Sequence, residues 1–289
     1  YIYTGTTGQV TGNALPANPT GKITVKLSDD GILKMSQATT ISIANGLTLE
    51  KGSLQLDNLN LSLTTAGSIA GTFDDTKKII TNGTGQLLMQ IPTSGLPITK
   101  LFPIGDVNYY SPASLNFTQN SAALTVGAKV APEVHSSIGA LEENKLGRYW
   151  SFTTSGSGTY TYKPSFTYVD TDVIGSEASM KPNRYNAEEY PEWSVYAGGA
   201  ENNVLTWTNE LSSSVDPLHN SDFTGKQDAC LAPTQQAGAV SLGTSTFNTQ
   251  VLKWASIGDG TAGVLVLVKE GSPITVGPLH ATIYDANPI

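Results

Sequence analysis

Acidic side chains that could ligate a metal gather in the stretch Asp170-Thr-Asp172-Val-Ile-Gly-Ser-Glu177. Calcium takes oxygen ligands, and acids at alternate positions with a glycine and a later acid suit it. The stretch departs from the EF-hand loop, because Val173 and Ile174 occupy ligand positions and the glutamate comes early. The alternative is an Asp-rich β-turn whose carboxylates bond nearby backbone amides. We expect the turn and no required cofactor, and keep Asp170, Asp172 and Glu177 as a candidate calcium site.

Tyrosine is the commonest aromatic residue, with 12 of them in the chain. A tyrosine ring can stack on a sugar while its hydroxyl stays in water. Tyr109 and Tyr110 lie in a loop rich in Pro and Asn, and Tyr160 and Tyr162 share one face of an expected strand. These four are the candidate glycan-stacking residues. The tryptophans sit in alternating strands and are expected in a core instead: Trp150, Trp193, Trp207 and Trp254.

Catalytic patterns are missing from the sequence. The sequence contains no Gly-x-Ser-x-Gly elbow, no His-x-x-x-His pair and no phosphate-binding loop. The three histidines, His135, His219 and His280, lie far apart in the sequence, and we expect each of them in a surface loop or strand. The acid pairs Glu142-Glu143 and Glu188-Glu189 are adjacent, so on a strand they would point to opposite faces. Convergence of acids from distant strands, as glycoside hydrolysis needs, cannot be read from spacing. We therefore expect a protein that is not an enzyme.

The composition narrows the class of protein. Only 14% of the 289 residues are charged, 29 are Gly and 15 are Pro, which favours an all-β fold over a helical one. The net charge of −8 without a basic block argues against nucleic acid or an anionic membrane as partner. A single Cys230 excludes an internal disulfide, and the longest apolar run, Val264–Val268, is too short for a membrane helix.

Short alternating strands fill residues 21–91. The apolar pairs beginning at Ile41, Leu47, Leu54 and Leu61 follow one another at 6 or 7 residues, so three steps span 20 residues. This is close to one coil of a parallel β-solenoid with three short faces. A meander of very short hairpins has similar spacing but buries little. We predict a short β-solenoid-like part over residues 1–98 and keep the meander as the alternative.

Longer and more aromatic strands follow the proline-rich passage around residues 92–103. Their length and irregular spacing predict an antiparallel β-sandwich over residues 99–289. The last strands expected are Gly263–Lys269 and His280–Tyr284. Both ends of the chain read as strands, which suggests that they pair either within their own sheets or with a neighbouring chain.

Several motifs occur in an order that resembles secreted surface proteins of the Bacteroidetes. The stretch Leu101-Phe-Pro-Ile-Gly-Asp-Val-Asn-Tyr-Tyr-Ser-Pro112 follows Leu-Thr-Leu repeats such as Leu47–Leu49 and precedes Arg148-Tyr-Trp150. The Asp-rich turn at 170–172, the Tyr185–Trp193 turn and Ile257-Gly-Asp259 complete the order. The resemblance covers residues 41–259 and implies export, often by the type IX route, to the cell surface or beyond. It implies no activity, and the usual C-terminal sorting domain is not visible after Asp259.

These observations together predict an extracellular protein from which a leader has been removed. We expect an adhesin-like protein or a structural subunit of a surface filament or array, with other copies of itself or other surface proteins as partners. The alternative is a carbohydrate-binding module of a secreted polysaccharide-processing system. We expect neither nucleic-acid binding nor membrane insertion.

Overall fold

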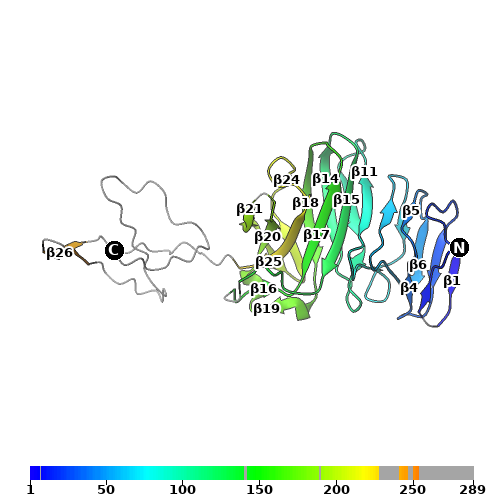
Figure 1. Cartoon of the computed structure of the whole chain (residues 1–289), viewed down its shortest axis with the longest axis horizontal. Coiled ribbons are helices and arrows are strands. Elements are labelled where there is room, and N and C mark those ends of the chain that lie inside the picture. Colours follow the sequence, from blue (N-terminus) through cyan, green and yellow to red (C-terminus); the bar gives the residue numbers. More distant parts are fainter. Residues whose placement is uncertain (7, 140–141, 189, 228–240, 247–249, 254–289) are drawn as a thin grey trace. The chain divides into compact units, whose positions relative to one another are not determined.

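The computed structural model describes residues 1–6, 8–139, 142–188, 190–227, 241–246 and 250–253, and it is all-β, as predicted (Figure 1). The chain divides into two units, Tyr1–Gln227 and Asp228–Ile289. In the second unit, strands β26 (Ser241–Ser245) and β27 (Gln250–Lys253) pair antiparallel. The strands expected at Gly263–Lys269 and His280–Tyr284 lie outside the described residues, as do Cys230 and Trp254.

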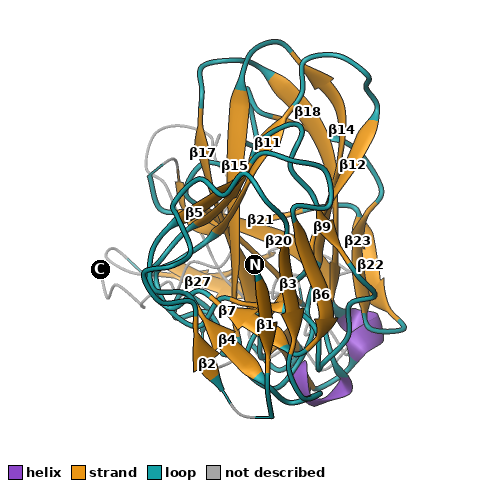
Figure 2. Ribbon diagram, turned by 90° about the vertical axis from the view of Figure 1, so that its right-hand side faces the viewer, coloured by secondary structure: helices purple, strands orange, loops and turns teal. Residues whose placement is uncertain are grey.

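The first part of the chain is a stack of coils with three parallel faces, which confirms the β-solenoid and not the meander (Figure 2). Residues 32 and 53 pair between coils, as do 61 and 87, so one coil takes 21 to 26 residues. The first face is β1 (Ile2–Thr4), β3 (Ile23–Lys26), β6 (Leu47–Lys51) and β9 (Ile69–Ala70). The second is β2 (Gln9–Val10), β4 (Ile32–Lys34), β7 (Ser53–Gln55), β10 (Ile79–Ile80) and β13 (Ile104–Gly105). The third is β5 (Thr39–Ile41), β8 (Leu61–Leu63) and β11 (Leu87–Ile91).

Alternation sets the interior of the coils, because every second side chain of a strand points inward. Leu47 and Leu49 are buried, whereas Thr48 between them is partly exposed.

At the corners of the coils, the backbones of successive coils come close to each other. A Cβ on Gly67 would lie 2.1 Å from the carbonyl oxygen of Ile41 in the coil below, so only glycine fits there.

The third face of the solenoid continues directly into the antiparallel part. Strand β11 pairs parallel with β8 on one side and antiparallel with β15 (Leu124–Ala131) on the other. The same sheet runs on through β17 (Tyr149–Ser155), β25 (Ser221–Lys226), β16 (Lys145–Leu146) and β19 (Val173–Ile174), with β20 (Lys181–Asn186) and β21 (Tyr190–Val195) attached at β25. The coils therefore extend to Gly105, beyond the predicted boundary at 98, and belong to the same compact unit as the strands up to Gln227.

A second antiparallel sheet packs on the first. Its strands are β12 (Ile98–Phe102), β14 (Ala113–Asn120), β18 (Tyr160–Thr167), β23 (Val204–Trp207) and β22 (Gly198–Glu201), with β24 (Leu211–Ser212) beside β18. Between the sheets, Trp150 stacks on Phe166 at 4.9 Å between ring centroids, and Trp207 meets Phe223 edge-on at 5.7 Å. Trp150 and Trp207 are thus in the core, as predicted.

Helix is almost absent from the part of the chain that the structure describes. Two 3-10 turns, η1 (Asp170–Asp172) and η2 (Glu177–Ser179), are the helical segments there. None of the described helices is long and apolar enough to cross a membrane.

Candidate functional site

Asp170 and Glu177 of the candidate calcium stretch are engaged by protein groups. The Asp170 carboxylate accepts a hydrogen bond from the Asn203 side-chain amide at 2.8 Å. The Glu177 carboxylate accepts one from the Tyr168 hydroxyl at 2.5 Å and one from the Asn203 backbone N–H at 3.0 Å. Burial and the nearby Glu177 raise the pKa of the Tyr168 hydroxyl, which stays a donor. The two acids therefore fix the position of Asn203.

The third acid, Asp172, belongs to a buried ion-pair cluster. Arg148, which is 1% exposed, donates from Nε to Asp172 and from Nη1 to Asp106, each at 2.6 Å. Asp106 also accepts the backbone N–H groups of Asn108 and Tyr109, which closes the loop after β13. Burial is the largest single influence on the pKa of Arg148 and lowers it, but the hydrogen bonds and charges of Asp172 and Asp106 together outweigh burial, so the pKa is raised. The cluster joins three of the motifs on which the resemblance rests.

No three His, Cys, Asp or Glu side chains within the described ranges form a group that could hold a metal ion. The three acids thus do not converge on one point, and the observed contacts are those of a turn held by local and tertiary hydrogen bonds. The Asp172 carboxylate thus pairs with the Arg148 guanidinium.

Two of the four candidate glycan-stacking tyrosines are in the core. Tyr162 is fully buried and Tyr160 nearly so, and both pack on Phe117 of β14. The Tyr162 hydroxyl donates to the Asp216 carbonyl at 2.8 Å. Sharing one strand face was predicted correctly, but this face points into the sandwich. The stacking hypothesis is therefore wrong for Tyr160 and Tyr162.

The other two tyrosines lie in the loop after β13 and are half-buried. The backbone N–H of Tyr110 donates to the Asp75 carboxylate at 2.7 Å, and its ring lies 6.4 Å from that of Phe73. Burial, with a smaller effect of Asp74, raises the pKa of Tyr110 to about 12. Tyr109 and Tyr110 keep part of their surface in water and stay candidates for a contact.

Sequence reasoning missed a cluster around His135, which was expected at the surface and is buried. Its Nδ1 accepts the Ser137 backbone N–H at 3.1 Å, so Nε2 carries the proton of the neutral ring and donates to Asp222 at 3.0 Å. Since both nitrogens are occupied, the ring has none left to activate a nucleophile. Trp193, predicted in the core, packs half-buried against His135 on the outer face of the sheet.

Strands β1 and β2 are the first strands of two faces of the described solenoid. Within the described part of the chain, β1 pairs only with β3 and β2 only with β4, so one side of each strand has unpaired backbone groups. Two apolar side chains on these strands point into water, with Ile2 72% exposed and Val10 61% exposed. Isolated exposed apolar residues are common, but here they accompany free strand edges.

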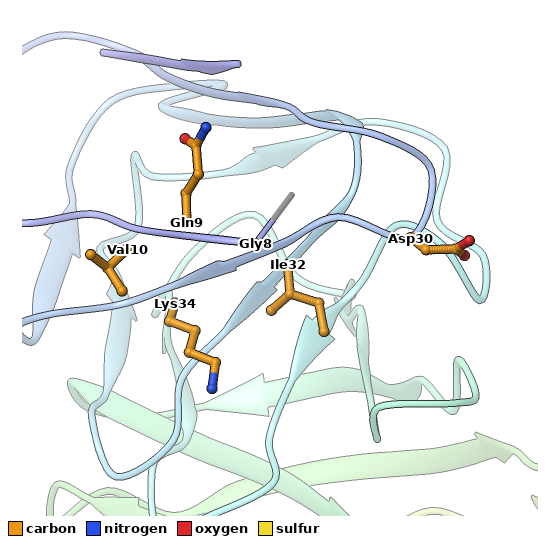
Figure 3. A pocket seen from close by; sticks show the side chains of 6 residues that line it. All are labelled: Gly8, Gln9, Val10, Asp30, Ile32 and Lys34. Carbon is orange, nitrogen blue, oxygen red and sulfur yellow. The ribbon is translucent and has the colours of Figure 1, made fainter. Parts of the chain in front are cut away.

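An open hollow of about 540 Å³ lies on the second face at this end (Figure 3). Val10 and Ile32 supply apolar surface, and Gly8 leaves space because it has no side chain. Lys34 and Asp30 add one charge of each sign. We name β1, β2 and this hollow the coil-end surface. It can accept an extended chain through backbone hydrogen bonds and bury an apolar side chain beside Val10.

Comparison with known proteins gives no family: no family model, no curated protein and no solved structure matches this chain.

Proposed function

We propose that this chain is a non-enzymatic protein of the cell surface that works by contact, as an adhesin-like or structural subunit, through its coil-end surface. The partner is a β-strand from another copy of the chain or from another surface protein. The observation that carries the proposal is the pair of unpaired strand edges, β1 and β2, at one end of the coil stack. The expected location outside the cell rests on the motif order alone.

The two edge strands are short, which limits strand addition, but they carry none of the residues that usually prevent it. Proteins block such edges with short strands, lysine, proline or bulges. β1 reads Ile-Tyr-Thr and β2 reads Gln-Val, with none of these residues. By contrast, the edge strand β12 of the second sheet has Lys100 at its centre. The absence of lysine from β1 and β2 supports the coil end as the edge to which a strand of another chain can be added.

Two effects contribute to the binding free energy of such a contact. Strand addition satisfies backbone donors and acceptors, each hydrogen bond contributing about 0.5–1.5 kcal/mol net. Burying an exposed Ile or Val side chain completely adds about 1.5–3 kcal/mol. Because Ile2 and Val10 are already partly covered, the contribution of each is smaller than this range.

The test is self-association of the full chain measured by light scattering over a wide concentration range. We expect the wild type to gain mass with concentration and the double variant Ile2→Lys/Val10→Lys to stay monomeric. Val215→Lys is the matched control, because Val215 is equally exposed but lies in a loop beyond β24. If the wild type and the double variant are both monomers throughout, self-association through this end is wrong.

A carbohydrate-binding module is the second candidate, and it is supported by the partial exposure of Tyr109 and Tyr110. A flat sugar-binding face needs coplanar rings, whereas Tyr185 and Trp193 on the outer sheet face are tilted by 42°. Screening a glycan array with the wild type and with a Tyr109→Ala/Tyr110→Ala variant tests this candidate. Binding that the variant loses would favour it.

A further inference from the structure

Four strands of the first sheet place a ring of side chains around His135. Tyr149 is on β17, Tyr185 on β20, Trp193 on β21 and Asp222 on β25. Tyr185 is the direct cross-strand partner of both Trp193 and Asp222, so these three share one face. Their chain neighbours Trp150, Arg184 and Phe223 are buried on the opposite side. We name Tyr149, Tyr185, Trp193 and Asp222 the aromatic cage.

The cage has the chemistry that recognises organic cations. Aromatic faces attract a cation within about 6 Å of the ring centroid, and quaternary ammonium groups are bound in this way. The His135 ring lies 4.7 Å from Tyr149, 5.1 Å from Tyr185 and 5.0 Å from Trp193. The imidazole thus occupies the position of such a guest.

Two acids lie at the cage, and Lys129, a lysine on the same sheet face, is two strands away from Asp222 in the register. Among the described residues, His135 is the only basic side chain in contact with the Asp222 carboxylate, so no lysine or arginine neutralises this carboxylate there. Glu133, in the loop that carries His135, is a second acid beside Tyr149. Burial, followed by Asp222 and Glu133, raises the pKa of the Tyr149 hydroxyl. A quaternary ammonium ion carries its charge at every pH, so it would attract these carboxylates whenever they are ionised.

The loop over the cage, residues 132–138, is attached to the sheet through His135 and through a hydrogen bond between the Glu133 and Tyr149 side chains, and its Ile138 side chain is buried. Besides the His135–Asp222 bond, the Trp193 indole N–H donates to the Ser137 carbonyl at 3.4 Å, which is a long bond. The turn within the loop closes on itself, with the Ile138 N–H donating to the His135 carbonyl at 2.9 Å. Because the loop closes on itself, displacing His135 moves residues 132–138 together, and this also breaks the Glu133–Tyr149 hydrogen bond and exposes Ile138.

We propose that the aromatic cage is a binding site for small organic cations of the alkylammonium class, and that residues 132–138 form its lid with His135 as the built-in occupant. A ligand enters by displacing the imidazole and pairs with Asp222 while the three rings surround it. This site lies on the outer face of the sheet and does not depend on the coil-end surface.

The first test uses tetramethylammonium chloride as the probe and tryptophan fluorescence as the readout. We expect His135→Gly to bind the cation at least ten-fold more tightly than the wild type, and His219→Gly, an exposed histidine outside the cage, to match the wild type. Adding Asp222→Asn to His135→Gly should reverse most of the gain. Neutral tert-butanol, of similar shape, should bind at least ten-fold more weakly than the cation.

A second test needs no variant and decides the case if His135→Gly does not fold. A glutamate-specific protease should cleave the wild type after Glu133 several-fold faster in tetramethylammonium chloride than in sodium chloride of equal ionic strength. Equal cleavage rates in the two salts would overturn the proposal. So would a folded His135→Gly that binds the cation no better than the wild type, or no better than tert-butanol.

Discussion

Replacing Arg148 with methionine tests whether the buried ion-pair cluster holds the coil stack to the sandwich. Asp106 follows the last coil strand, β13, and Asp172 ends the 3-10 turn η1. Arg148 bridges them with two hydrogen bonds of 2.6 Å and is 1% exposed. Methionine keeps much of the apolar stem of the side chain but removes the charge that compensates two carboxylates.

The expected loss in the free energy of unfolding follows from that geometry. Removing one partner of a buried ion pair costs about 3–5 kcal/mol. Because Arg148 serves two buried carboxylates, we expect the upper part of that range, about 4–5 kcal/mol. For a unit of the size of Tyr1–Gln227, each kcal/mol lowers Tm by about 2–4 °C, so the loss is about 8–20 °C.

The assay is urea unfolding followed by tryptophan fluorescence, to which the buried Trp150 and Trp207 contribute along with the other two tryptophans of the chain. Thermal unfolding by circular dichroism is the second measurement. The control is Lys26→Met, which breaks the exposed Lys26–Glu50 pair, 3.2 Å between charged atoms, and should cost about 0–1 kcal/mol. A loss for Arg148→Met no larger than that of the control would refute the reasoning. A triple variant that also neutralises Asp106 and Asp172 as asparagines should regain part of the loss, since no buried charge is left unpaired.

Three further predictions concern the same unit. Burial raises the pKa of Tyr110 to about 12, above the roughly 10 of an unfolded tyrosine, so the unfolded chain ionises first and the free energy of unfolding falls between about pH 10 and 12. Tyr110→Phe should make that alkaline decline shallower in denaturant titrations at successive pH values. Gly67→Ala forces a Cβ to 2.1 Å from a backbone oxygen and should cost about 1–3 kcal/mol in urea unfolding, whereas Gly21→Ala, with open space, should cost less than 1 kcal/mol. Because Asp172 is paired with Arg148, EDTA should leave Tm unchanged; a drop in Tm that calcium restores would reinstate the calcium site.

The coil stack was predictable because its signal is local. Apolar pairs 6 or 7 residues apart mark successive faces, and the observed pairing of Thr39 with Leu61 closes one coil of 22 residues. The junction was less predictable. β11 looks like any other coil strand in the sequence, and its antiparallel partner, β15, comes from residues far along the chain. The shared sheet therefore depends on tertiary contacts that the local pattern does not encode. The last coil strand is Ile104–Gly105, beyond the predicted boundary.

For the candidate sites, too, the sequence pattern does not encode which distant residues come together. Period-two alternation groups Tyr160 with Tyr162 but does not say whether their face is the inner one. One usable signal was overlooked: if Trp150 points inward, Tyr149 beside it must point outward, which marks one wall of the aromatic cage. That His135 would meet Tyr149, Tyr185 and Trp193 depends on four strands coming together, which spacing along the chain does not encode.

The continuity of β11 with both halves of the first sheet has a mechanical consequence for a protein that acts by contact. Hydrogen bonds between coils run along the stack, so tension applied at β1 opens one strand pair at a time instead of shearing many together. We expect coils to peel off in order until β11, which is joined to the antiparallel sheet through β15. Each coil of 21 to 26 residues releases about 80 Å of extended chain. Under pulling, the N-terminal part would lengthen in steps and absorb work while the antiparallel sheets stay intact.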